Sequence, residues 1–122
     1  MLALQQFVTH RDQLPVETFP WGNIQWIANS QLLPAGQQTL GICQINPGHA
    51  NALHYHPNCE ELLYVVQGTG RHSFDDQWIE LRPGTTIRVP TGVKHNLINE
   101  GREVMITWIS FSSGERQTVF LE

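Results

Sequence analysis

The chain has 122 residues, 40% of them apolar and 15% charged, and its formal net charge is −4. This size and composition predict one soluble globular domain over residues 1–122, with enough apolar side chains for a single core. No apolar run is long enough to span a membrane and no basic stripe is present, which argues against membranes and nucleic acids as partners. The first residues lack the features of a secretory leader, so we expect a cytoplasmic location.

Strand-like runs rich in β-branched and aromatic residues alternate with turn residues along the chain. Pro, Gly, Asn and Asp mark the turns, as in residues 46–48 and 90–92. The only helical structure that we expect is one or two short turns within residues 2–12. The predicted strands span residues 23–29, 38–45, 52–55, 61–67, 70–74, 77–81, 86–89, 95–98 and 103–111. This succession of short strands is typical of an all-β domain.

Two of these strands, over residues 61–67 and 104–111, are apolar at both odd and even positions. Successive side chains of a strand point to opposite faces, so apolar side chains cover both faces of these strands. We expect both faces to be buried, which places the strands in a sandwich or a closed barrel rather than in an open, half-exposed sheet.

Three histidines and a glutamate gather in two turn-rich stretches. His54 and His56 are two positions apart on a predicted strand, so both imidazoles point to the same face. Glu61 begins the next strand, and His95 follows the turn over residues 90–92, which can return the chain to the same cavity. A buried carboxylate without a partner is unfavourable, and a cation would compensate its charge. Three imidazoles and one carboxylate therefore predict a site for one divalent metal ion (Fe, Mn, Ni, Zn or Cu), whose identity the sequence leaves open.

A second carboxylate, Glu60, directly precedes Glu61 and competes with it as the fourth ligand. Glu61 has the same parity as Leu63 and Val65, so it begins on a face that we expect to be buried. Glu60 begins on the opposite face. We therefore favour Glu61.

The spacing of these residues resembles the two sequence motifs of the cupin superfamily. The matching positions are Gly48, His54, His56, Glu61 and Gly68 in the first motif, and Gly84, Pro90, Gly92, His95 and Asn99 in the second. The short interval between the motifs is similar to that of small single-domain cupins. The resemblance implies a single jelly-roll β-barrel (a double-stranded β-helix) with the metal in its mouth. It also implies that the metal ligands are His54, His56, Glu61 and His95.

Several other residues are candidates for the pocket. His72 stands where similar proteins carry an apolar β-branched residue, and it is either an acid or base lining the cavity or a partly exposed strand histidine. Arg88 is a candidate for binding an anionic substrate group, although its parity with Thr86 favours a solvent-facing position. Asn99 is expected to shape a turn, and Cys43, within an apolar run, is expected to be a buried thiol.

The leading functional interpretation is a metal-dependent enzyme that acts on a small organic molecule. Four protein ligands leave two positions of an octahedral shell for water, substrate or dioxygen. Dioxygenase-type chemistry is favoured over isomerase, cyclase or lyase chemistry, because His72 is the only candidate for a second base. A non-catalytic module that binds or senses a small molecule is the alternative from another class, and a purely structural metal site is a third.

We also expect a homodimer. A barrel of this size has edge strands that must be covered, and small cupins commonly dimerise. Residues 1–30 precede most of the predicted barrel and are the expected edge-covering and dimerisation segment.

Overall fold

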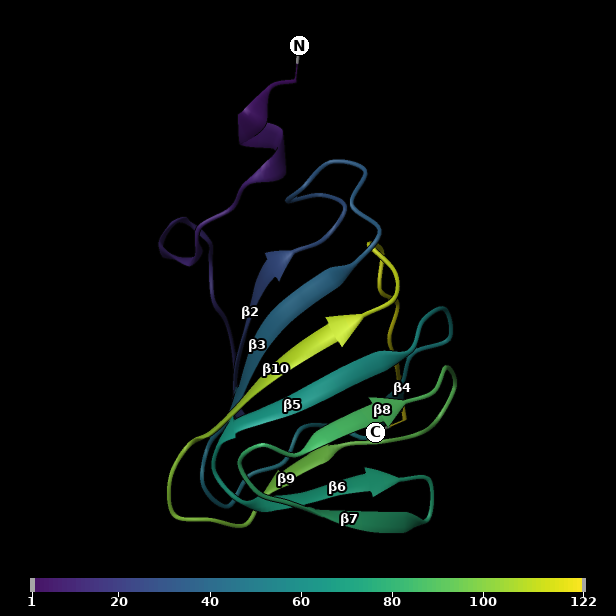
Figure 1. Cartoon of the computed structure of the whole chain (residues 1–122). Coiled ribbons are helices and arrows are strands. Elements are labelled where there is room, and N and C mark those ends of the chain that lie inside the picture. The colour runs from purple at the N-terminus through teal and green to yellow at the C-terminus, as the bar shows by residue number, and fades with distance from the viewer. Residues whose placement is uncertain (1, 122) are drawn as a thin grey trace.

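The computed structural model describes residues 2–121, and these residues form an almost entirely β-stranded domain (Figure 1). Two short 3-10 helices, η1 (Leu4–Phe7) and η2 (Arg11–Gln13), precede the strands. The strands are β1 (Glu17–Phe19), β2 (Gly22–Ala28), β3 (Thr39–Ile45), β4 (His54–Tyr55), β5 (Glu61–Gln67), β6 (Gly70–Phe74), β7 (Gln77–Leu81), β8 (Thr86–Val89), β9 (Leu97–Asn99), β10 (Met105–Phe111) and β11 (Val119–Phe120). None of the helices in the described part of the chain is long and apolar enough to cross a membrane.

The strands form one large antiparallel sheet and two smaller ones. The large sheet has the order β1-β2-β3-β10-β5-β8. The others are β7-β6-β9 and the pair β11-β4. An isolated bridge between His54 and His95 links β4 to the segment that leads into β9. Strands that neighbour each other in space are mostly distant in sequence, as in a jelly roll. The prediction of an all-β jelly roll is confirmed.

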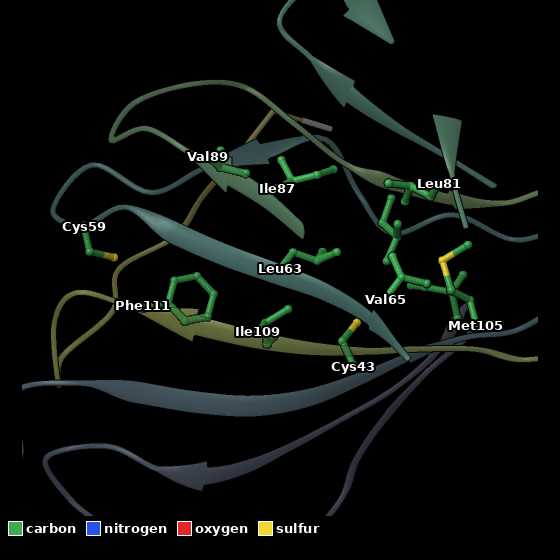
Figure 2. Packing of buried hydrophobic residues seen from close by; sticks show 12 residues of the cluster. Cys43, Cys59, Leu63, Val65, Leu81, Ile87, Val89, Met105, Ile109 and Phe111 are labelled. Atoms are coloured by element: carbon green, nitrogen blue, oxygen red, sulfur yellow. The ribbon is translucent and has the colours of Figure 1, made fainter. Parts of the chain in front are cut away.

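The core lies on one face of the large sheet. On β5, Leu63 and Val65 are buried, and on β10, Met105 and Ile109 are buried. Their cluster includes Leu81 of β7 (Figure 2). It also includes Leu97 of β9, so it joins the large sheet to the three-stranded one. The full cluster consists of Cys43, Ile45, Cys59, Leu63, Val65, Leu81, Ile87, Val89, Leu97, Met105, Ile109 and Phe111. The alternation of side chains along each strand therefore places one face of the sheet in the interior.

The expectation that β5 and β10 are buried on both faces is wrong for the single chain. Leu62 and Tyr64 of β5 are 47% and 39% exposed, and Trp108 of β10 is 51% exposed. The Tyr64 and Trp108 rings lie 5.6 Å apart on this outer face. Their apolar composition correctly indicates that these strands are central, but no described residue of the single chain covers their outer side.

The glycines of the two sequence motifs serve the turns. Gly48, Gly68, Gly84 and Gly92 all have φ between +76° and +97°, a region that side chains with a Cβ rarely adopt. Gly68 is also crowded, because a Cβ there would lie 2.8 Å from the Cα of Met105. These positions require glycine for the backbone conformation, and the turns that they form bring the ligand-bearing segments together.

The N-terminal segment reaches the edge of the large sheet. Residues 9–14 run along β2, where Thr9 Oγ1 donates to the Ile27 carbonyl at 2.7 Å and Gln25 Nε2 donates to the Arg11 carbonyl at 2.7 Å. β1 then pairs with β2 as the edge strand. Within the N-terminal segment, Met1 lies outside the described residues. Four apolar side chains at its beginning are 57–70% exposed: Leu2, Leu4, Phe7 and Val8.

Candidate metal centre

Three histidines from different parts of the chain meet at one end of the interior. His54 lies on β4, His56 follows that strand, and His95 precedes β9. One ring nitrogen from each lies within 4.8 Å of the others. The backbones of His54 and His95 are joined by a reciprocal pair of N–H···O bonds of 3.0 and 2.8 Å. This bridge fixes the separation of two of the imidazoles without any contribution from their side chains.

Each imidazole is oriented by a backbone carbonyl. The Nδ1 atoms of His54, His56 and His95 lie 2.6, 2.9 and 2.9 Å from the carbonyl oxygens of Ala52, Gln117 and Val93, respectively. A carbonyl oxygen only accepts hydrogen bonds, so Nδ1 is the donor in each ring. In the neutral imidazoles the Nε2 atoms then present lone pairs. This second contact through the other ring nitrogen is the arrangement that holds metal-binding histidines in place.

Glu61 supplies a carboxylate to the same point from β5. Its Oε1 atom lies 3.1 Å from His95 Nε2 and 3.3 Å from His56 Nε2, and the side chain is buried. A carboxylate oxygen and the lone pair of a neutral imidazole are both acceptors, so they repel unless a proton or a cation lies between them. Burial alone would raise the pKa of the Glu61 carboxyl, but the contacts with His56 and His95 hold it well below its usual value.

The pKa values of His95 and His54 are shifted by the same buried surroundings. Burial acts to lower the pKa of His95, and the adjacent Glu61 carboxylate raises it above its usual value. Burial and the neighbouring His95 lower the pKa of His54 to about 4. Three imidazoles and a carboxylate that share one point fit the borderline ligand preferences of a divalent transition metal. The donor set therefore agrees with the predicted metal site, and the histidine cluster is suited to hold a metal ion.

The cluster opens into a cavity of about 440 Å³, a volume typical of sites for small organic molecules. Most of the remaining lining is apolar or aromatic. The walls are formed by Glu17, Phe19, Trp21, Ile24, Trp26, Cys43, Asn51, Ala52, Leu63, His72, Leu97, Ile109, Phe111, Arg116, Thr118 and Phe120. The parts of the wall outside the metal-site motifs come from β1, β2, the C-terminal residues 116–120 and four central positions, Cys43, His72, Ile109 and Phe111.

His72 lies in the cavity wall. It is 1% exposed, and its ring stacks on that of His95 with centroids 5.4 Å apart and planes inclined by 13°. Neither ring nitrogen has a hydrogen-bond partner among the described residues. Burial, followed by the neighbouring His95, lowers the pKa of His72 to about 4. Of its two predicted locations, the structure places His72 in the interior.

Arg88 does not reach the cavity. Its side chain is 64% exposed and its Nε atom donates to Glu60 Oε2 at 2.6 Å. Both residues project from the outer face of the large sheet, because Ile87 and Val89 take the inward positions of β8. The carboxylate that competes with Glu61 in the sequence thus points away from the histidines.

Sequence reasoning missed the charged residues of the cavity wall. Arg116 and Glu17 line the cavity, but neither belongs to a motif or to a predicted strand. β1 and β11 were also missed, since they are only three and two residues long. Polar residues in such short strands carry no periodic signal by which the sequence could place them.

Cys43 also lines the cavity but is 3% exposed. Burial, with a smaller effect of the Glu61 carboxylate, raises the pKa of its thiol to about 12. The thiolate is the reactive form, so we expect Cys43 in the folded protein to resist iodoacetamide at neutral pH. Mass spectrometry of the Cys59→Ser variant before and after unfolding measures this. Stoichiometric labelling of the folded variant would contradict the expectation.

Comparisons with known proteins identify the family of the chain and agree with its fold. The cupin domain family model matches residues 41–111. Protein SchB of Streptomyces halstedii is 29% identical over 101 residues, which cover 83% of this chain and 73% of SchB. Polyketide synthase CurC of Streptomyces cyaneus is 28% identical over 82 residues, covering 67% of this chain and 53% of CurC.

Solved structures share the same architecture. The formate complex of Lactobacillus farciminis oxalate decarboxylase has a TM-score of 0.86 and 25% identity, covering 92% of this chain and 35% of that one. A Bacillus subtilis oxalate decarboxylase described with Mn(II) centres has a TM-score of 0.81 and 23% identity, covering 90% of this chain and 30% of that one. The chain thus spans about a third of the length of these enzymes. At this level of identity the second structure shows the shared fold alone, and the case for a metal ion in this chain rests on its own histidine cluster. Since the family model covers more than half of the residues, this chain belongs to the cupin domain family.

Proposed function

We propose that the chain is a metal-dependent enzyme that acts on a small organic molecule in the cavity. One observation carries this proposal: the Nε2 atoms of buried histidines face the Glu61 carboxylate at 3.1–3.3 Å with their Nδ1 protons already donated to carbonyl groups. These hydrogen-bond acceptors repel each other unless a cation lies between them. They lie in the wall of a cavity of about 440 Å³. A purely structural ion would not need such a cavity.

His54, His56, Glu61 and His95 are the proposed ligands of one divalent ion. A bound ion would supply Lewis-acid or redox chemistry at the cavity wall. His72 is the group that we assign to proton transfer, because its ring nitrogens are buried, unpaired among the described residues and beside His95. The apolar walls would exclude water from the reacting molecule and orient its carbon skeleton.

Two reaction classes compete. The sequence favours dioxygenase chemistry. The position of His72 in the cavity wall instead supports a reaction with a proton-transfer step, such as an isomerase, cyclase or lyase reaction. Similarity to a polyketide synthase and to an oxalate decarboxylase supports a carbonyl or carboxylate compound as substrate. Dioxygenase chemistry stays as the alternative within the enzyme class.

The test starts from protein purified without added metal. Elemental analysis is expected to find close to one divalent ion per chain, and a panel of carbonyl and carboxylate compounds is then incubated with and without oxygen. Turnover that continues without oxygen and falls in His72→Gln at unchanged metal content supports the proton-transfer class. Turnover that needs oxygen supports the dioxygenase. Binding without any turnover would favour the non-catalytic binding or sensor module, and absence of bound metal would contradict the proposal.

We also propose that the chain forms a homodimer through the outer face of the large sheet. Leu62, Tyr64 and Trp108 expose neighbouring apolar side chains there, and the apolar side chains of the N-terminal segment are more exposed still. Monomeric proteins rarely expose an apolar area of this kind. Each copy supplies both features, as a two-fold interface requires.

The Trp108→Glu variant is expected to shift the protein from dimer to monomer at micromolar concentration, because a charge would be buried against a second apolar face. Light scattering measures the mass. Trp78→Glu is the matched control, since Trp78 is 49% exposed on β7, outside the large sheet. A monomeric wild-type protein at this concentration would contradict the proposal.

A further inference from the structure

Arg116 is the one cationic side chain, Lys or Arg, in the wall of the cavity among the described residues. It lies between β10 and β11 and is half-buried. Its guanidinium group stacks over the Trp26 ring at 4.2 Å and over the Phe111 ring at 5.4 Å. Two aromatic rings therefore hold the guanidinium group in place through contacts that use none of its N–H donors.

The positive charge of Arg116 has no direct counterion in the described part of the chain. The ion pairs there join Arg71 to Glu100 and Arg88 to Glu60, and the others involve histidines. Of the five N–H groups of Arg116, one donates to the Thr118 hydroxyl. Burial lowers the pKa of Arg116, and the more distant carboxylate of Glu61 partly offsets this effect. The protein thus keeps a partly desolvated cation with spare donors.

Arg116 is closely connected to the histidine cluster. His56 packs edge-on against the Phe111 ring, with centroids 4.9 Å apart, and Arg116 lies over the same ring. The Thr118 hydroxyl contacts both His56 Nδ1, at 3.2 Å, and Arg116. A small molecule can therefore lie with one end at the histidine cluster and the other at Arg116.

We propose that Arg116 binds the carboxylate of the substrate, whose other end lies at the histidine cluster and whose carbon skeleton packs on the aromatic walls. A guanidinium edge matches a carboxylate by forming two parallel hydrogen bonds. A single arginine, with the carboxylate of Glu17 in the same wall, suits one negative charge better than a doubly charged phosphate. The ligand class is a small monocarboxylic acid. This inference rests on the proposed function, since it assigns the substrate class of the same cavity.

The test compares carboxylic acids with their primary amides, which have nearly the same shape but no charge. The probes are acetate, benzoate and 3-phenylpropanoate with their amides, and calorimetry measures their dissociation constants on the metal-loaded wild-type protein. We expect at least one acid to bind about 10–100-fold more tightly than its amide, the usual size of hydrogen bonding to a charged group. No preference for any acid, including no binding at all, overturns the proposal.

Variants then assign the preference to a residue. Arg116→Gln should bind the acid and the amide equally, and Arg116→Lys should retain part of the preference because it keeps the charge without the two-pronged edge. Arg88→Gln is the matched control, since Arg88 is exposed outside the cavity, and it should bind as the wild type does. An Arg116→Gln variant that keeps the full acid preference contradicts the proposal. Because a carboxylate also binds a divalent ion more tightly than an amide does, the wild-type comparison alone can overturn the proposal but cannot assign the preference, and Arg116→Lys is the second variant if Arg116→Gln folds poorly.

Metal analysis of the same samples separates this proposal from the proposed function. Arg116→Gln should keep the wild-type metal content, because Arg116 is not a proposed ligand. A wild-type protein that holds metal but has no acid preference overturns the role of Arg116 alone. A wild-type protein that holds no metal contradicts the proposed function, whatever it binds.

Discussion

Replacement of His56 by alanine is expected to abolish stoichiometric binding of a divalent ion while the sheets stay folded. His56 contributes one of the three clustered ring nitrogens, and its Nε2 faces the Glu61 carboxylate. Loss of a contact that only orients a ligand weakens metal binding by about 10–100-fold, so loss of a ligand should exceed this. Elemental analysis of the purified variant and calorimetric titration with Mn(II) measure the effect.

His10→Ala is the control for this variant. His10 is an exposed histidine whose contacts are to Asp12, far from the cluster in sequence, and it should leave the metal content unchanged. Glu61→Gln tests the fourth ligand separately, because the amide keeps the shape and removes the charge. If His56→Ala binds metal as tightly as the wild type, with an unchanged circular dichroism spectrum, the assignment of the site is wrong.

Replacement of Asn99 by aspartate should destabilise the fold by about 3–5 kcal/mol, the range for an uncompensated buried charge. Asn99 is 1% exposed, and its Nδ2 donates to the carbonyl oxygens of Ile45 and Glu103 at 2.9 and 2.8 Å. Aspartate has almost the same shape but would place a carboxylate oxygen against two carbonyl oxygens. Denaturation by urea at neutral pH measures the free energy of unfolding.

Asn58→Asp is the matched control. Asn58 also bridges two backbone groups, through Nδ2 to the Glu115 carbonyl and Oδ1 to the Gln117 amide, but it is exposed. Water can solvate the new charge there, so we expect a change within about 0.5 kcal/mol. A loss of less than about 1 kcal/mol in Asn99→Asp would refute the view that Asn99 ties the turn to β3, since a single unsatisfied buried group already has about that effect.

The sequence was sufficient to predict that the candidate metal ligands meet, because local rules determine where their side chains point. The spacing of two between His54 and His56 and the shared parity of Glu61 with Leu63 decide which way these side chains point. The glycines then set the turns that close the site. The prediction of Glu61 over Glu60 agrees with the observed burial of Glu61 and the external ion pair of Glu60.

The alternation of odd and even positions along a strand was less informative where tertiary contacts determine the position of a side chain. It could assign Arg88 to one face of its strand. It could not indicate that Arg116, which lies outside every predicted strand, packs on Trp26. That contact joins residues 90 positions apart, and no local pattern encodes it. The prediction that the outer face of β5 and β10 is buried was wrong for a similar reason. Apolar composition indicates that a face needs to be buried, but it does not say whether the same chain covers it.

The walls of the cavity extend across the boundary of the family region. All four proposed ligands lie within residues 41–111, as does Phe111, whereas Trp26 lies before this region and Arg116 after it. If Arg116 binds the substrate as proposed, the residue that recognises the ligand and the proposed metal ligands lie on separate stretches of the chain. Exchange of residues 116–120 for those of another cupin is then expected to redirect the cavity to a new compound while the proposed metal ligands stay unchanged.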